Sequence, residues 1–596
     1  MIKRYGVLPG FISLLLMIFC TSQTFAMGVR PDEPVFKAAE AAYEISWRDD
    51  VKITAHDSVI LAANVFVPKT TNPAERFPVI IMPSSWLCEE HEYYLQGAKF
   101  CEKGYIVLEY SPRGWGISTG LVNVGGPDDM KDIQTIISYA IANYPVDGVV
   151  KNSAGQITDD SKAKVGMCGI SYGGGFSLLG AAFDQRVKAS MCMVPWGDLG
   201  SALYLNQTTK DVWHWLVLLE AGDIIGNLDP SVRELSEMLF SHDHESYYNY
   251  VINWAMDRSP IAYLDELNYT DDGKPRDIAI CISSNLQDEM FPPNATMNLF
   301  YGLKTPKKRM DINRGIHASA EGAGIIGMEN VVWRKAHAWM DEHLKGIKTG
   351  IMDLKPMSIC NKDNGERYYT DHVYLKDLNM GYLDGLYDTA DNVNTITPDR
   401  YYLGVRSAGR LYGKLGASPL TTSETNTIQT GSNSGITTGI PAISSLLEAH
   451  TNFLHVITPF ALTNRKESIV FTSESFTKDR LIMGTPHLKL NVTPSTSSFQ
   501  LIAHLYTLDA YGNGTLISHA PLTILGNGKF MPNAKAGQKY TNEFNFITTC
   551  ATIKKGERLA LAIDTEDLNY GKAPDTEYKL TFTYNSDAML SVPFSN

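Results

Sequence analysis

One serine of this sequence stands where its hydroxyl group could act as a nucleophile. Ser171 is the central residue of a Gly-x-Ser-x-Gly motif over residues 169–173. A short apolar run over 165–170 precedes it, and residues 172–183 suit a helix. A serine in such a strand-to-helix turn has a strained backbone and an exposed hydroxyl, and the glycines remove side chains that would collide. The motif alone recurs by chance, but this context predicts a nucleophile elbow.

Two later residues could complete a catalytic triad with Ser171. Asp288 follows the strand-like run 278–283, and His317 follows the run 309–313. In a parallel sheet the carboxyl ends of the strands meet at one edge, so the three side chains should arrive together. Their order along the chain, Ser, Asp, His, is that of α/β-hydrolases. We predict that Ser171 is the nucleophile, that His317 is the general base and that Asp288 orients His317.

Other residues compete for the acid and the base. Glu289 is a local rival for the acid, because it directly follows Asp288. His337 and His343 are rivals for the base, but both lie in the amphipathic segment 330–344. The solvent face or the carboxyl end of a helix suits these two histidines better. The prediction therefore stays with the first pair.

The anion that forms during attack on a carbonyl group needs hydrogen-bond donors. The helix predicted after the elbow begins at Tyr172, so its first backbone N–H groups point toward the serine. Backbone donors in this position stabilise the negative charge of a tetrahedral intermediate. The backbone N–H of Tyr172 is therefore a predicted donor of the oxyanion hole.

The segments before the motif indicate the fold that positions it. Residues 51–68 alternate in a two-residue rhythm typical of a β-hairpin. Residues 77–83 and 104–110 are continuous apolar runs, as in strands that are covered on both faces. A helical pattern over 128–144 follows before the elbow strand. This alternation predicts an α/β-hydrolase core over 27–350, with a mostly parallel sheet and helices on both of its faces.

Two other regions do not follow this alternation. From about residue 199 to 270 the strands stop and aromatic helical segments take over, which predicts a helical cap inserted over the site. Beyond about residue 352 there is almost no helical pattern and there are many short alternating stretches. They predict a C-terminal all-β jelly-roll (galactose-binding-like) domain over 351–596. Within it, the Thr/Ser/Asn/Gly-rich stretch 421–438 is predicted to be a loop or a poorly ordered insert.

The first residues have the layout of a secretory signal. Lys3 and Arg4 precede an apolar stretch over 7–20, and small and polar residues lead to Ala26. The apolar part is too short and wrongly flanked for a membrane span. We predict a signal peptide over 1–26 and a periplasmic or secreted protein without a stable membrane anchor.

Composition argues against several classes of partner. The chain has 596 residues and a net charge of -13 at pH 7, and no Lys/Arg-rich run occurs in it. This balance argues against binding to nucleic acid. No CxxC and no HExxH motif is present, so we expect no metal and no cofactor.

With these features in place, the chain resembles the X-prolyl dipeptidyl-peptidase and cocaine-esterase (CocE/NonD) family of serine hydrolases. The resemblance runs from about residue 51 to near residue 591. It is carried by the hairpin with Asp57, the loop 113–120, the elbow 165–174, Asp288 before Phe291, His317, the helix end 339–346 and the strand 469–474. The resemblance implies an α/β-hydrolase core, a helical cap and a C-terminal jelly roll.

The chain departs from this family at three points. Relatives carry an aspartate before the Arg-Gly loop, where this chain has Tyr-Ser-Pro at 110–112. Relatives place an oxyanion-hole tyrosine soon after the strand 79–82, where this chain offers Trp86. An indole N–H is a hydrogen-bond donor, so Trp86 is the second predicted oxyanion donor. Some members hold a substrate amine with acids around the catalytic aspartate, and here only Glu289 follows Asp288.

These residues predict a secreted or periplasmic serine hydrolase that cleaves an ester or amide acyl bond through an acyl-enzyme. The expected substrate is a small-molecule ester or amide or a short peptide. An X-prolyl dipeptidyl-peptidase is the alternative among enzymes. A hydrolase-fold binding protein without turnover is the alternative of another class. The sequence leaves a homo-oligomer open.

Overall fold

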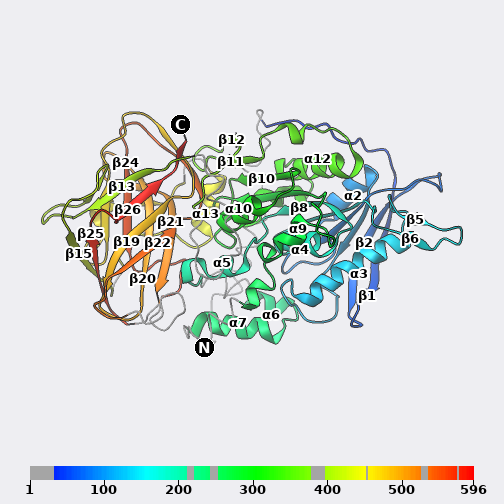
Figure 1. Cartoon of the computed structure of the whole chain (residues 1–596), viewed down its shortest axis with the longest axis horizontal. Helices are drawn as coiled ribbons and strands as arrows, with labels where there is room; N and C mark the ends of the chain where they lie inside the picture. Colours follow the sequence, from blue (N-terminus) through cyan, green and yellow to red (C-terminus); the bar gives the residue numbers. More distant parts are fainter. Residues whose placement is uncertain are drawn as a thin grey trace.

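The computed structural model describes residues 33–210, 220–241, 253–376, 396–431, 433–451, 454–524, 535–572 and 576–595. The predicted signal peptide, residues 1–26, lies outside these residues. The described chain forms a sheet-and-helix part and an all-β part, which lie side by side (Figure 1). No helix in the described ranges is long and apolar enough to cross a membrane.

The first part is built on a sheet of ten strands in the order β1-β2-β4-β3-β7-β8-β9-β10-β11-β12. These strands are β1 (Ile45–Thr54), β2 (Ile60–Pro68), β3 (Val79–Pro83), β4 (Ile106–Tyr110), β7 (Val165–Ile170), β8 (Val187–Met193), β9 (Ala279–Asn285), β10 (Lys308–Asn313), β11 (Met357–Cys360) and β12 (Arg367–Thr370). The strands from β4 to β11 pair in parallel, and β1 with β2 forms the predicted hairpin. The mostly parallel sheet is therefore confirmed.

The end of this sheet lies beyond the boundary placed at residue 350. Strand β11 pairs in parallel with β10, and β12 pairs antiparallel with β11. The sheet-and-helix part thus continues to Thr370. A short alternating run looks the same at the edge of either domain, so only its pairing partner decides to which sheet it belongs.

Helices cover both faces of the sheet, as the buried strands require. They are α2 (Tyr94–Glu102), α3 (Pro127–Asn143), α4 (Tyr172–Phe183), α10 (Pro293–Gly302), α11 (Ser319–Ile325) and α12 (Val331–Lys345). The side chains of strand β3 alternate between the two faces. Val79 and Ile81 join the core under α3 and α4. Ile80 and Met82 join the core under α2 and α12. Successive side chains of a strand point to opposite faces, so a continuous apolar run fills two cores.

The predicted cap lies between β8 and β9. Its described helices are α5 (Leu199–Leu203), η3 (Leu205–Gln207), α6 (Ala221–Ile225), α7 (Pro230–Ser241), η5 (Pro260–Tyr263) and α9 (Leu264–Asn268). Among the residues that the structure describes, no strand of the sheet falls between β8 and β9. The expected interruption of the sheet by helices is confirmed for these ranges.

In its described residues, the C-terminal part is almost entirely β-structure, with a twelve-stranded sheet and a three-stranded sheet. Its strands are β13 (Asp399–Gly404), β14 (Gly413–Gly416), β15 (Glu424–Gln429), β16 (Ile457–Pro459), β17 (Ile469–Thr472), β18 (Arg480–Gly484), β19 (His487–Pro494), β20 (Phe499–Leu508), β21 (Asn513–Ile524), β22 (Tyr540–Asn545), β23 (Thr549–Ile553), β24 (Arg558–Asp564), β25 (Lys579–Tyr584), β26 (Met589–Val592) and β27 (Phe594–Ser595). The all-β prediction is therefore confirmed.

Two elements of this part differ from the sequence-based expectation. Strand β15 lies within the stretch 421–438 that was expected to be a loop, and it pairs antiparallel with β25. Helix α13 (Ile443–His450) interrupts a region with no expected helix. Strand β15 gave no strand signal because it is polar and half-exposed at a sheet edge, and helix α13 is too short for a clear periodic signal. Helix α13 lies where the two parts of the molecule meet (Figure 1).

Candidate active site

Ser171 occupies a sharp turn between β7 and α4. Its φ of 56° and ψ of -115° are unfavourable for a residue with a side chain. The turn is held because the N–H of Ser171 donates to the carbonyl oxygen of Met193 at 2.8 Å. This is the geometry of a nucleophile elbow, in which backbone strain places the hydroxyl at the carboxyl edge of the sheet.

The glycines of the motif are required by close backbone contacts. A Cβ atom on Gly173 would lie 2.1 Å from the carbonyl oxygen of Pro83, and one on Gly169 would lie 2.5 Å from the carbonyl oxygen of Gly173. Neither neighbour is a flexible side chain that could move away. The elbow therefore depends on the absence of both side chains.

Replacement of Gly173 by alanine is expected to lower the free energy of unfolding by about 2–3 kcal/mol, because the added methyl group overpacks against fixed backbone. Urea unfolding followed by circular dichroism measures this. Gly416→Ala is the matched control, since the nearest atom to its added Cβ lies 3.6 Å away. Equal stability of the two variants would contradict the expectation.

Ser171, His317 and Asp288 lie in one hydrogen-bonded row. The Ser171 hydroxyl is 2.7 Å from His317 Nε2, and His317 Nδ1 is 2.8 Å from Asp288 Oδ2. All three residues are buried. Because Nδ1 faces a carboxylate, the proton of a neutral ring belongs on Nδ1, and Nε2 is left to accept the proton of the serine. The arrangement can therefore activate the hydroxyl group.

Two loops bring the acid and the base to the serine. Asp288 lies in the loop after β9, residues 286–291, which we call the acid loop. His317 lies after β10, in the loop 314–318 that we call the histidine loop. The backbone N–H groups of Met290 and Phe291 donate to Asp288 Oδ1 at 2.9 and 2.8 Å. These two bonds hold Oδ1 of the carboxylate, so that Oδ2 points toward His317.

The rivals for the acid and the base lie elsewhere. Asp288, not Glu289, contacts the histidine, and Glu289 accepts a hydrogen bond from the Ser445 hydroxyl at 2.6 Å. His337 is buried, with Nε2 at 3.1 Å from Gln96 Oε1, so its expected place on the solvent face of the helix is wrong. Its ring stacks on Phe100, which the helical period alone did not reveal.

The two predicted oxyanion donors lie next to the elbow. Tyr172 is the first residue of α4, so its backbone N–H stands at the amino end of that helix. The Trp86 ring is half-buried and contacts the rings of Trp115 and Tyr172, with centroids 4.6 and 5.4 Å apart. Trp86 thus lies beside the residue that follows the nucleophile.

A buried carboxylate lies near the histidine loop, and the sequence analysis did not identify it. Glu321, in the first turn of α11, accepts hydrogen bonds from the Ser283 hydroxyl and the Asn285 side-chain amide at 2.9 and 3.0 Å. The Asn285 amide also donates to the carbonyl oxygen of Ile316 at 2.9 Å. Burial raises the pKa of Glu321, although its hydrogen bonds from Asn285 and Ser283 oppose that rise. The polar residues at the end of β9, Ser283 and Asn285, were the sequence feature that could have indicated a buried polar partner.

A lysine of the cap contacts the acid loop from another side. Lys210 Nζ donates to the carbonyl oxygens of Ala202 and Met290 at 2.6 and 3.2 Å. Burial lowers the pKa of Lys210 to about 7, against the opposing charges of Asp288 and Glu289. No motif in the sequence connects this lysine with the triad.

Within the described part of the chain, two groups of side chains come close enough to hold a metal ion: His56, Asp57 and Asp132, and Glu89, Glu90 and His91. The Arg113 guanidinium already pairs with the first group, at 3.0 Å from Asp57 and 2.7 Å from Asp132. Both ring nitrogens of His91 are bonded to carboxylates at 3.0 Å. Each group fits an ion pair better than a metal ion.

Family models match both parts of the chain. Residues 57–319 match the model of the X-Pro dipeptidyl-peptidase (S15 family), and residues 388–591 match that of the X-Pro dipeptidyl-peptidase C-terminal non-catalytic domain. An uncharacterized protein of Pseudomonas aeruginosa is 22% identical over 316 residues, which are 48% of this chain and 78% of that protein.

Solved structures of the same fold cover almost the whole chain. A CocE/NonD family hydrolase from Staphylococcus aureus has a TM-score of 0.66 at 13% identity, covering 96% of this chain and 99% of its own. An α-amino acid ester hydrolase has a TM-score of 0.67 at 16% identity, covering 95% of this chain and 100% of its own. At these identities the likeness concerns the fold.

Proposed function

Because the chain belongs to the X-Pro dipeptidyl-peptidase and CocE/NonD family of α/β-hydrolases, and is therefore a hydrolase, we propose that it is a serine hydrolase that cleaves an ester or amide acyl bond. The observation that carries this proposal is the row from Ser171 through His317 to Asp288, with bonds of 2.7 and 2.8 Å. The same row argues against a binding protein that has lost turnover.

In the proposed reaction, Ser171 Oγ attacks the acyl carbon while His317 Nε2 takes its proton. Asp288 stabilises the resulting imidazolium. The imidazolium then protonates the leaving alcohol or amine as its bond to the acyl carbon breaks. Water gives its proton to His317 and attacks the acyl-enzyme, and the acid product leaves as the proton returns to Ser171. The backbone N–H of Tyr172 and the indole of Trp86 hold the oxyanion in both steps.

A fluorophosphonate probe tests the proposal on the purified mature protein, since it labels only a serine made nucleophilic by its surroundings. Wild type is expected to be labelled, Ser171→Ala not at all and His317→Ala much more slowly. A folded wild type that stays unlabelled would overturn the proposal in favour of a binding role.

Replacement of Trp86 by phenylalanine tests the second oxyanion donor, because it keeps an aromatic ring against Trp115 and Tyr172 but removes the indole N–H. Loss of one such donor lowers kcat by about 10²–10³-fold. We expect a fall in kcat with little change in KM. Steady-state kinetics on a chromogenic ester measure both, and an unchanged kcat would leave the backbone of Tyr172 as the donor to examine.

Substrate preference and export are further proposals. We propose a small-molecule ester or amide or a short peptide as substrate, with peptides that carry proline in the second position as the alternative. Product analysis on matched ester and X-Pro amide substrates decides between the two.

We also propose export through the N-terminal segment, for which N-terminal sequencing of the mature protein should find cleavage near Ala26.

A further inference from the structure

The acid loop, residues 286–291, is held by three different parts of the molecule. Gln287 fixes it to the histidine loop: its N–H donates to the Gly315 carbonyl at 2.9 Å, and its Oε1 accepts from the Gly315 N–H at 3.0 Å. Lys210 of the cap binds the Met290 carbonyl at 3.2 Å. The third contact, through Glu289, comes from the C-terminal domain.

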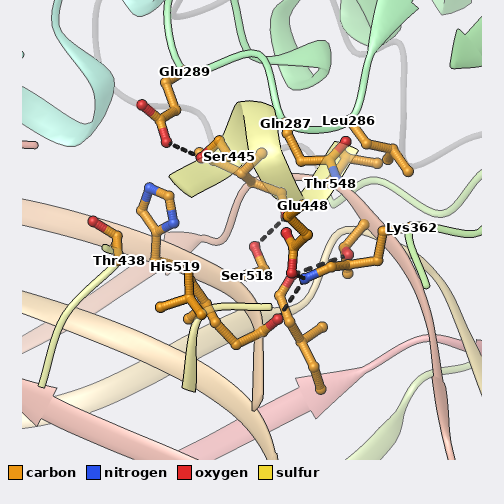
Figure 2. Close-up of a pocket in the computed structure, with 15 residues that line it drawn as sticks. Leu286, Gln287, Glu289, Lys362, Thr438, Ser445, Glu448, Ser518, His519 and Thr548 are labelled. Atoms are coloured by element: carbon orange, nitrogen blue, oxygen red, sulfur yellow. Dashed lines mark hydrogen bonds and ion pairs between the residues drawn. The ribbon is translucent and has the colours of Figure 1, made fainter. Parts of the chain in front are cut away.

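Glu289 is buried against that domain and makes two hydrogen bonds to it. Its Oε1 accepts from the Ser445 hydroxyl of α13 at 2.6 Å and from the Asn569 side-chain amide at 3.3 Å. Figure 2 shows its carboxylate directed at Ser445. Because Asp288 is the neighbouring residue in the chain, holding the Glu289 side chain also holds the backbone from which Asp288 projects.

The C-terminal side of this contact is itself firmly supported. The Asn569 amide also donates to Thr438 Oγ1 at 2.8 Å. Thr438 donates to Asp567 through its backbone N–H and its hydroxyl, at 2.7 and 2.6 Å. His504 Nε2 of strand β20 lies 3.2 Å from Asp567. The side chains of all four residues are buried, so the partner of Glu289 is anchored in the interior of the β domain.

A cavity of about 50 Å³ lies beside the carboxylate of Glu289. Gln287, Glu289, Thr438, Ser445 and His519 are among the residues that line it (Figure 2). Among the described residues, the buried Nε2 of Gln287 has no hydrogen-bond partner. The hydrogen bonds of Glu289 therefore add a directional hold to the apolar packing of Leu286, Met290 and Phe291, which lie in one buried cluster with Ala442.

We propose that the C-terminal domain positions the catalytic acid: Ser445 and Asn569 hold Glu289, and Glu289 holds Asp288 in line with His317. Glu289 is thus a positioning residue, which acts through Asp288. The inference rests on the proposed role of Asp288 in the reaction. A shift of a catalytic group by about 1 Å can lower the rate by about 10²-fold, so a loop support of this kind affects turnover.

Four proteins test the positioning role. Glu289→Ala removes the acceptor of both hydrogen bonds, and the double variant Ser445→Ala, Asn569→Ala removes both donors. Glu289→Gln is the conservative variant, since its amide oxygen can still accept from Ser445 and Asn569. Asn294→Ala is the matched control, because Asn294 joins the same two domains through Phe546 and Thr548, with bonds of 2.8 and 2.9 Å.

The first measurement does not need turnover. The proton between His317 Nδ1 and Asp288 gives a far-downfield ¹H NMR signal, which His317→Ala assigns by its loss. We expect this signal to broaden or disappear in Glu289→Ala and in the double variant, and to persist in Glu289→Gln and Asn294→Ala. An unchanged signal in Glu289→Ala would overturn the inference whether or not the wild type is an enzyme.

The second measurement uses catalysis. Glu289→Ala and the double variant are expected to lower kcat by about 10–100-fold with KM unchanged, and Glu289→Gln to restore most of the rate. Equal losses in Asn294→Ala would mean that any weakening of domain contact slows the enzyme, and would also overturn the inference. A wild type without turnover speaks against the proposed function, and the NMR signal then decides the positioning role alone.

Discussion

Ser171→Ala is expected to lower kcat by about 10⁵-fold or more, and His317→Ala is expected to cost about as much. The double variant should be no slower than either single variant. The reason is that the hydroxyl and the imidazole act as one unit across their 2.7 Å contact, so either is without effect when the other is gone. The remaining rate would come from the oxyanion donors and from substrate binding.

Single-turnover kinetics on a chromogenic ester measure these losses with the enzyme in excess. Ser138→Ala and His343→Ala are matched controls, because Ser138 bonds the Gln134 carbonyl on α3 and His343 packs on Trp339 in α12. Both controls should keep the wild-type rate. Losses that multiply in the double variant would mean that Ser171 and His317 act independently, contrary to the proposed mechanism.

Asp311→Asn is expected to lower the free energy of unfolding by about 3–5 kcal/mol, the largest effect on stability that we predict. Asp311 of β10 is fully buried, at 2.8 Å from Arg309 Nη2 and 2.9 Å from Lys335 Nζ. Both cations are buried too. The substitution removes the carboxylate that both cations contact in the core, where a charge that loses its partner is most costly.

The effect of Asp311 should depend on pH. Burial opposes its ionisation, but the charges of Arg309 and Lys335 outweigh burial and hold the pKa of Asp311 far below its ordinary value. The folded-state pKa is thus lower than that of the unfolded chain, which is about 3.9. The contribution of Asp311 to stability is therefore fully present above about pH 4 and is lost progressively as the pH falls further.

Urea unfolding of wild type and Asp311→Asn at several pH values between neutral and acid measures this difference. We expect the difference in free energy of unfolding between the two proteins to be largest near neutral pH and to become smaller below about pH 4. Asp371→Asn is the control, since Asp371 pairs with Lys355 where both side chains are more than half exposed. Such surface pairs contribute about 0–1 kcal/mol. A gap of that size for Asp311 would contradict the expectation.

The sequence by itself determined the local features of this protein. The elbow could be predicted because its signals are adjacent in the chain: the glycines on either side of Ser171 and the apolar run before it. The continuous apolar runs of β3 and β4 predicted strands covered on both faces. Ser171, Asp288 and His317 each follow a predicted strand, so we expected them to meet at one edge of the sheet. The structure places these three side chains within hydrogen-bond distance, as that order led us to expect.

Only the tertiary structure decided which residues meet across long distances in the chain. The contact of Glu289 with Ser445 joins residues 156 positions apart, and no local pattern encodes it. The same holds for β11, which joins the first sheet through its pairing with β10, and for the charges gathered around Asp311. Periodicity reports which face of a segment is buried, but not what it is buried against. That choice depends on how whole elements pack, and it determines how the acid loop is held.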